Sequence, residues 1–350
     1  MKNLLWLVLF SLFVVRFVYT RPVYKQGDTV RITATVSSQP IRYTTSQYIK
    51  LVGLKTYLPA FPEISYGDKV VVEGLVKDDK LQNPKLLKVT PTNNVLYRLR
   101  QNLISFYKSA IPEPHASLVA GMVIGSKQAI PQDFMDNLKA TGTAHVVVAS
   151  GMNVTLVGGF ILNSLTAIMK RRKALVVSLI CIWIYALMAG FDAPIVRAAI
   201  MGTIAFTAQE LGRLNYSLRA LFLSGFVMLI INPSWISDLG FILSFMATLS
   251  LILFQTKIDR LIRFVPGILR QDLSTTIAAQ VGVAPIIFYV FGQFNLLSPL
   301  YNVLVLWTIP FITIIGFVAG AIGLLIPGVG RLILWLAYPL TGWFNTVISI

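Results

Sequence analysis

The sequence predicts a polytopic α-helical membrane protein that carries a small β-barrel domain outside the membrane. Of its 350 residues, 55% are hydrophobic and only 13% are charged, and the mean hydropathy is +0.72. Soluble globular domains carry about a quarter charged residues, so this composition excludes an ordinary soluble protein. Long apolar runs begin at His145, whereas residues 21–108 hold fourteen Lys and Arg against six Asp and Glu. A basic module joined to a membrane domain suggests that the chain collects or docks on a polyanion at a membrane surface.

Residues 1–20 form the first predicted unit, an N-terminal membrane anchor. Lys2 precedes an apolar stretch over residues 4–15. This stretch fits either a signal peptide or an anchor, but no small-x-small cleavage site precedes Arg21 and several of its residues are bulky aromatics. We therefore expect an uncleaved and rather short anchor.

Residues 21–92 are expected to form the extracytoplasmic barrel. The runs 29–36 and 70–76 alternate between apolar and polar residues, as strands with one buried face do. Two short strands around Gly53 and one at 86–89 bring the expected number to five. A partly open Greek-key barrel of the oligonucleotide-binding (OB) type is a common arrangement for such a domain. An SH3-like barrel is the alternative.

Aromatic and basic side chains interleave in the middle of this OB-like module. Single-strand binding needs cations that follow phosphates and flat rings on which bases stack, at about 1–3 kcal/mol per base. The same residue types also occur in barrels that bind nothing, because tyrosines are common there and lysines solvate an exposed surface. The candidate DNA-binding residues are Arg42, Tyr48, Lys50, Lys55 and Tyr57.

A helical pattern replaces the strand pattern in residues 93–144. An apolar stripe over 95–107 runs beside three basic residues, among them Arg100, as expected of an amphipathic helix lying on anionic headgroups. The apolar stretch 117–125 is too short to span a membrane. We therefore expect interfacial or re-entrant pieces packed against the bundle.

Residues 145–350 form the predicted multi-helix membrane domain. Basic residues gather in the loops at 170–173, 210–219 and 256–272, whereas the intervening loops hold no base. The basic side is cytoplasmic by the positive-inside rule, which places the barrel outside the cytoplasmic membrane. The predicted spans are 150–169, 174–190, 195–209, 220–231, 239–255, 274–291, 300–326 and 332–350.

The segment 145–160, HVVVASGMNVTLVGGF, is the most informative part of the membrane domain. Gly151, Thr155 and Gly159 are spaced by four and would let another helix approach closely. The segment resembles the signature of the ComEC competence channel family, in which a histidine is followed four residues later by a small residue and Ser-Gly. Further segments similar to successive landmarks of that family are 191–194, 197–201, 232–235, 238–241, 243–245, Pro285, and Ser298-Pro299 with Asn302.

The resemblance implies a channel that passes single-stranded DNA into the bacterial cytoplasm during natural transformation, after the external OB-like domain has received it. It implies a transporter and not an enzyme, with no cofactor. The expected partners are single-stranded DNA, the lipid bilayer and other DNA-uptake proteins, including a separate motor or nuclease, and a homodimer is one assembly to consider.

The sequence also departs from the family. Many relatives continue into a metallo-β-lactamase-like domain whose metal site needs several histidines and aspartates, but only His115 and His145 occur here. We therefore expect no metal site and no nuclease of that kind in this chain. The end inside an apolar run and the single anchor are features of a truncated or minimal member.

Polar groups within or beside apolar segments are costly unless they face a polar cavity or a partner, so they are candidates for a translocation path. Two of them have structural alternatives: Asp192 could pair with Arg197, and Asp238 could cap the helix that follows it. The candidate channel residues are His145, Ser150, Gly151, Asn153, Asp192, Arg197, Asp238, Ser244 and Asn302.

Two other functions remain open from the sequence. An intramembrane hydrolase would use Ser150 as nucleophile and His145 as base, with Asp192 or Asp238 as the orienting acid. A separation of five residues on one helix turns two side chains about 140° apart, so this pair would need a break in the helix. The third candidate is a small-solute transporter, or a membrane scaffold, with an external binding module.

Overall fold

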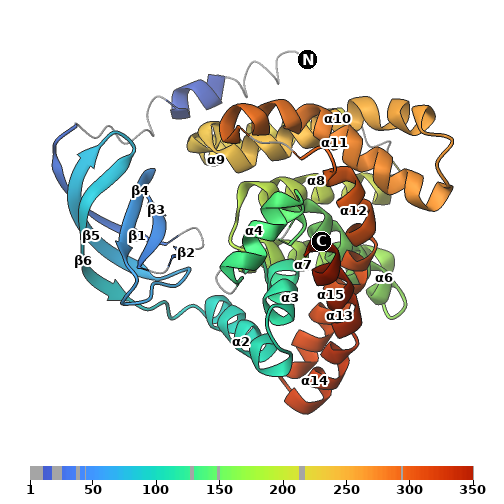
Figure 1. The fold of residues 1–350 in the computed structure, drawn as a ribbon, viewed down its shortest axis with the longest axis horizontal. Helices are drawn as coiled ribbons and strands as arrows, with labels where there is room; N and C mark the ends of the chain where they lie inside the picture. The colour runs from blue at the N-terminus through green and yellow to red at the C-terminus, as the bar shows by residue number, and fades with distance from the viewer. Residues whose placement is uncertain are drawn as a thin grey trace.

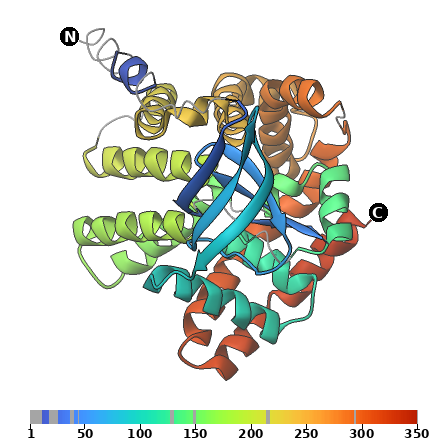
Figure 2. The same ribbon diagram turned by 90° about the vertical axis from the view of Figure 1, so that its left-hand side faces the viewer.

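The computed structural model describes residues 11–17, 26–36, 40–43, 45–126, 130–147, 150–212, 217–292 and 295–349. Figure 1 shows a small sheet at one end of the molecule and a helical part that makes up the rest. When the molecule is turned by 90°, the sheet lies in front of the helices (Figure 2). The chain is therefore mainly helical with a small N-terminal sheet, as predicted.

The sheet has six strands in the order β1-β5-β6-β4-β3-β2. The pair β4–β6 is parallel, and the other pairs are antiparallel. Between the described strands, no hydrogen-bonded pair closes the sheet into a barrel, although β1 comes near β3. The strands are β1 (Thr29–Thr35), β2 (Ile41–Arg42), β3 (Ser46–Leu51), β4 (Leu54–Pro59), β5 (Lys69–Lys77) and β6 (Lys80–Thr90).

The predicted strand phases are correct, because Ile32, Val70 and Val72 face the buried side of the sheet. Two details differ. Strand β2 was not expected, and β6 begins before Asn83-Pro84 and continues through it. A register irregularity in the β5–β6 pair accommodates this dipeptide, since proline is tolerated in a strand at a bulge or an edge.

The helical part follows β6 through a short linker. The Asp68 carboxylate holds the linker against the sheet by accepting from the Ser65 and Thr92 amides at 2.8 and 3.0 Å. The helices are α2 (Val95–Ala110), α3 (His115–Ile124), α4 (Gln132–Ala140), α5 (Ala144–Val147), α6 (Gly151–Thr166), α7 (Arg171–Met188), α8 (Ala193–Glu210), α9 (Ser217–Ile231), the 3-10 turn η1 (Pro233–Ser237), α10 (Leu239–Leu261), α11 (Gly267–Phe291), α12 (Ser298–Leu306), α13 (Thr308–Gly323), α14 (Pro327–Trp335) and α15 (Tyr338–Ile348).

The helices long and apolar enough to cross a membrane are fewer than the eight predicted. They are Leu239–Leu261, Leu269–Val290 and the stretch Ala144–Thr166, whose residues 148 and 149 lie outside the described part, and the pair α12–α13, bent by 45°, is a fourth if it forms one broken span. The expected continuous segments 300–326 and 332–350 are both divided. Pro310 in the first turn of α13 and Pro339 near the start of α15 favour new helices at these two points.

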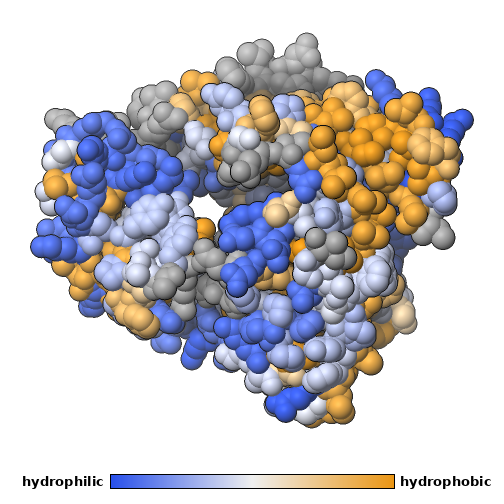
Figure 3. All heavy atoms as spheres, viewed as in Figure 1, coloured by the Kyte–Doolittle hydropathy of each residue, from blue (hydrophilic) through white to orange (hydrophobic). Residues whose placement is uncertain are grey.

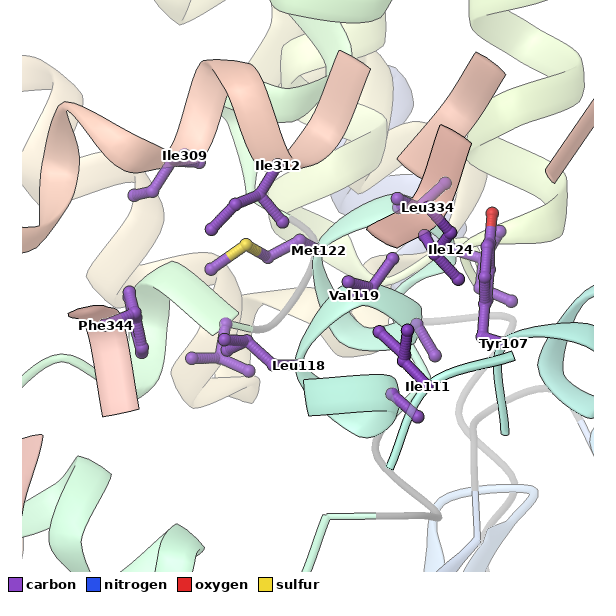
Figure 4. Packing of buried hydrophobic residues seen from close by; sticks show 14 of the residues in the cluster. Tyr107, Ile111, Leu118, Val119, Met122, Ile124, Ile309, Ile312, Leu334 and Phe344 are labelled. Atoms are coloured by element: carbon purple, nitrogen blue, oxygen red, sulfur yellow. The ribbon is translucent and has the colours of Figure 1, made fainter. Parts of the chain in front are cut away.

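One apolar core joins α2 and α3 to the C-terminal helices (Figure 4). Every residue of α3 from Ala116 to Ile124 is buried, so this stretch does pack against the bundle, and its interfacial or re-entrant placement stays a prediction. The Tyr107 hydroxyl on α2 donates to the Gly316 carbonyl on α13 at 2.9 Å. Residues 93–144 therefore pack with the membrane domain, and residue 144 marks no break in the core.

The most apolar surface in Figure 3 lies over α10 and α11. Few residues of these two helices are fully buried, with only 11% and 17% of their apolar windows buried, and they present large side chains such as Leu253 and Phe288. Such a surface is expected of helices in contact with lipid.

Candidate nucleic-acid interface and channel residues

Four of the five predicted DNA-binding residues share one face of the β3–β4 hairpin. The register places Tyr48 opposite Tyr57 and Lys50 opposite Lys55. The residues between them face the buried side of the sheet, because side chains alternate along a strand. The two tyrosine rings are tilted by 48° with centroids 5.2 Å apart, and Tyr57 is 46% exposed. The fifth residue, Arg42, lies on β2, and its side chain is outside the described part of the chain.

Both lysines of this hairpin face have carboxylate partners. Lys55 Nζ lies 2.6 Å from Asp79 Oδ2, and Lys50 Nζ lies 4.0 Å from Asp238 Oδ2. The hydrogen bond from Lys55 lowers the pKa of Asp79, and the same bond raises the pKa of Lys55. A polyanion that used these cations would have to displace the carboxylates of Asp79 and Asp238.

Asp238 connects the hairpin face to the membrane domain. It is the N-cap of α10 and accepts from the Phe241 amide at 3.0 Å, so the predicted capping role is confirmed. Its other oxygen faces Lys50 on β3. Figure 3 shows an opening between the sheet and the helices, bordered by hydrophilic side chains beside β2 and β3 and in the region of α4. The hairpin face therefore looks toward the helical part.

A buried arginine on α2 holds the sheet against α7. Arg100 is 1% exposed, its guanidinium carbon lies 5.3 Å from the centre of the Tyr66 ring, and it donates to the Met188 carbonyl. Tyr66 packs edge-on against Tyr97 with centroids 4.9 Å apart, and its hydroxyl donates to the Leu187 carbonyl at 3.4 Å. Tyr66 of the sheet module is thus hydrogen-bonded to the C-terminal end of α7.

Burial lowers the pKa of Arg100 to about 10, and the nearby Tyr66 ring and Asp192 carboxylate oppose this shift. The prediction that Arg100 faces lipid headgroups was therefore wrong. The sequence contains a signal for its position, because Arg100 is four residues after Leu96 and three before Leu103, on the apolar stripe of the helix.

Three predicted channel residues meet where α6, α8 and α10 come together. Arg197 Nη1 donates to the Ser244 carbonyl on α10, and a Cβ placed on Gly151 would lie 3.3 Å from Arg197 Nη2. Asp192 acts electrostatically on Arg100. The described contacts of Arg197 include no bond to that carboxylate, so the alternative in which Asp192 pairs with Arg197 is not seen among them.

Two buried asparagines make other contacts. Asn153 Nδ2 donates to the Met122 carbonyl at 2.8 Å, and its Oδ1 has no hydrogen-bond partner in the described residues. Asn302 Nδ2 lies 3.4 Å from Ser298 Oγ, and its Oδ1 is also without a partner there. Unsatisfied buried amides are rare in folded proteins, so both positions remain candidates for contact with water or a ligand.

The predicted hydrolase pair is not assembled in the described residues. His145 Nδ1 lies 3.0 Å from the Gly142 carbonyl. Ser150 has an extended backbone (φ −105°, ψ 167°) just before α6, so the two residues do not lie on one uninterrupted helix. However, no described hydrogen bond joins Ser150 to His145, and the expected orienting acids, Asp192 and Asp238, interact elsewhere.

The predicted helix-packing face of α6 is only partly correct. A Cβ added to Gly159 would meet no atom within 4 Å, and the Thr155 hydroxyl bonds within its own helix. The close contact is made by Gly158, where a Cβ would lie 2.6 Å from Ile182 Cδ1 on α7. The sequence pattern missed it because two adjacent glycines offer two possible faces.

Loop contacts agree with the predicted sidedness. Three residues from three different non-basic loops contact the part of the chain before the membrane domain. Asp192 interacts with Arg100, Asp238 with Lys50, and Asn295 with the carbonyl of Ala140. On the basic side, Arg171 and Arg172 both pair with Glu210, and Arg270 pairs with Asp259. The orientation of these two sides in the membrane stays a prediction.

The competence protein family matches residues 122–350 of this chain. The chain belongs to the competence protein family. This match confirms the predicted resemblance and covers the positions at which Gly151, Arg197 and Ser244 meet.

Two relatives are similar over much of the chain. ComE operon protein 3 of Bacillus subtilis (strain 168) is 28% identical over 253 residues, which are 72% of this chain and 32% of that protein. An uncharacterized protein of Aquifex aeolicus (strain VF5) is 27% identical over 205 residues, which are 58% of this chain and 46% of that protein. The matched region thus spans less than half of either relative. No solved structure matches the chain.

Proposed function

We propose that this competence-family protein conducts single-stranded DNA across the bacterial cytoplasmic membrane during natural transformation. The external sheet module would receive the strand, and the membrane domain would pass it on as a multi-pass channel. The energy and any nuclease activity would come from separate DNA-uptake proteins. The observation that carries this proposal is the hairpin face of Tyr48, Lys50, Lys55 and Tyr57, which looks toward the membrane domain across a hydrophilic opening (Figure 3).

The architecture of the module supports an OB-like barrel. Its hairpin β3–β4 meets β6 through the parallel pair, and β5 links β6 to β1, which is a Greek-key arrangement with one gap between β1 and β3. OB barrels bind oligonucleotides on their central strands and adjoining loops. In this sheet β3 and β4 carry a cross-strand tyrosine pair and two lysines, which are the groups that bind bases and phosphates.

The full-length protein in detergent provides the test. We expect fluorescence anisotropy to show binding of a labelled dT20 oligonucleotide, with a log-log salt slope of about −0.7 per phosphate neutralised. Changing Tyr48 and Tyr57 together to alanine should weaken binding at least about fivefold, since each stacked base contributes about 1–3 kcal/mol. As a matched control, alanine at Lys85 and Lys88, exposed on β6, should have a smaller effect.

Two results would oppose the proposal. Binding that is independent of salt would exclude phosphate recognition. Equal loss from the tyrosine changes and from the β6 control would show that the hairpin face is not the binding surface, and a scaffold role for the module would then fit better.

A further inference from the structure

The start of α6 is open to a hydrogen-bond acceptor. Ser150 is the N-cap residue, but its side chain makes no capping hydrogen bond, and the first turn contains no acidic residue. The first amides of a helix lack partners within the helix, and the helix dipole favours negative charge there. An uncapped start inside a membrane domain therefore favours an anionic ligand.

Arg197 brings a positive charge to the same place. Its Nη1 donates to the Ser244 carbonyl, its Nη2 lies beside Gly151, and its Nε is fully buried without a hydrogen-bond partner in the described residues. The ion pairs seen among the described residues do not include Arg197. A buried guanidinium nitrogen without a hydrogen-bond partner or counter-ion is costly, so a mobile anion would stabilise Arg197.

Glycine at position 151 lets the Arg197 guanidinium lie close to the first amides of α6. A Cβ there would lie 3.1 Å from the Ala198 Cβ and 3.3 Å from Arg197 Nη2, so any side chain would press on the guanidinium. A guanidinium beside the N-terminus of a helix combines two groups that recognise phosphate oxygens.

We propose that the α6 amides at Gly151 and the Arg197 guanidinium form a phosphate-binding site, which holds a phosphodiester of the single strand as it passes through the membrane domain. This inference rests on the proposed function. Free phosphate and lipid headgroups offer the same oxygen atoms, so the test has to separate these three sources.

Protection of Arg197 from reaction with phenylglyoxal tests the site in the wild-type protein, without any substitution. The full chain is placed in phosphatidylcholine nanodiscs, and modification of Arg197 is measured by mass spectrometry with the exposed Arg98 as reference. Saturating dT20 should abolish the modification of Arg197 and leave that of Arg98 unchanged. A dT20 with neutral methylphosphonate linkages should not protect, because it lacks the phosphate charge.

Each other outcome opposes the proposal. Protection by inorganic phosphate alone, or only in phosphatidylglycerol nanodiscs, would assign the site to free phosphate or to lipid. If no probe protects Arg197, the site does not exist. If dT20 still binds the hairpin face while Arg197 remains reactive, this inference fails and the proposed function stands.

Variants give a second measurement, the uptake of labelled DNA by cells at matched membrane levels of protein. Arg197→Gln should reduce uptake at least about tenfold, as expected from losing a charge-assisted contact, and Arg197→Lys should retain part of it. Insertion of a short methylphosphonate stretch into the DNA should slow uptake by the wild type but make no further difference to Arg197→Gln. Equal sensitivity of both proteins to that stretch would contradict the site.

Discussion

Freeing Lys55 from its carboxylate partner should strengthen single-strand binding. Lys55 is held by Asp79 at 2.6 Å, with the two side chains 44% and 55% exposed. In the bound state this lysine would have to exchange a carboxylate for a phosphate. Asp79→Asn removes the competing charge and leaves the shape of the side chain nearly unchanged.

The size of the effect follows from the exposure of the pair. An exposed salt bridge contributes about 0.2–1 kcal/mol, so its removal should raise the affinity for dT20 by about 1.4- to 5-fold at low salt. If Lys55 then neutralises one more phosphate, the salt slope should steepen by about 0.7. Both quantities come from one anisotropy titration repeated over a salt series.

Asp78→Asn is the matched control, because it makes the same change of charge one residue away. Asp78 accepts from Gln26 Nε2 at 3.0 Å and has a φ of 54°, a conformation that asparagine tolerates. The reasoning is refuted if the two variants change the affinity equally, since the effect would then come from net charge alone.

The pH dependence of the Lys55–Asp79 ion pair has a defined sign. Lys55 lowers the pKa of Asp79, so the pair forms above that lowered pKa and is lost only as the pH falls through it. An ordinary aspartate has a pKa of about 3.9, and the pair therefore persists throughout the range from pH 7 to pH 5. The affinity ratio of Asp79→Asn to the wild type should stay constant over this interval.

Three further predictions concern the fold and its orientation. Gly158→Ala should lower the free energy of unfolding of the purified protein by about 1–3 kcal/mol relative to Gly159→Ala, as measured by thermal unfolding. Only the first alanine crowds Ile182, whereas both variants gain the same helix propensity. Equal stability of the two variants would contradict the packing. Arg100→Met should release the module from α7, which limited proteolysis would detect as faster cleavage of the linker than in the wild type. In a cysteine-free background, a cysteine at Lys77 should react with an impermeant reagent in intact cells and one at Arg260 should not; the reverse pattern would invert the topology.

Local periodicity was sufficient to predict the hairpin face. Tyr48 and Lys50 are two residues apart, as are Lys55 and Tyr57, and a turn around Gly53 must bring the two pairs together on one side. The carboxylate partners could not be predicted in this way. Asp79 and Asp238 come from other parts of the chain, and tertiary packing alone brings them to the lysines.

Hydropathy located the apolar segments but not their breaks. An average over a window of residues does not register where a helix ends, so 300–326 and 332–350 were each expected to be continuous. The prolines at the starts of α14 and α15 were a visible signal for two of the new helices. Pro310, in the first turn of α13, is a similar signal for the break at Trp307, because proline cannot donate to the carbonyl four residues before it.

The two candidate sites differ in how an anion would bind, and this difference suggests a direction of transfer. At the hairpin face, phosphates compete with carboxylates for Lys50 and Lys55, so each contact formed breaks another and net affinity is small. At Arg197 no ion pair with a carboxylate is seen among the described residues, and the guanidinium is partly buried with its Nε removed from water, where a charge-assisted contact is stronger. A strand held weakly outside and more firmly inside would advance from the first site to the second without energy supplied at that step. The later release toward the cytoplasm would then be the step that needs a partner protein.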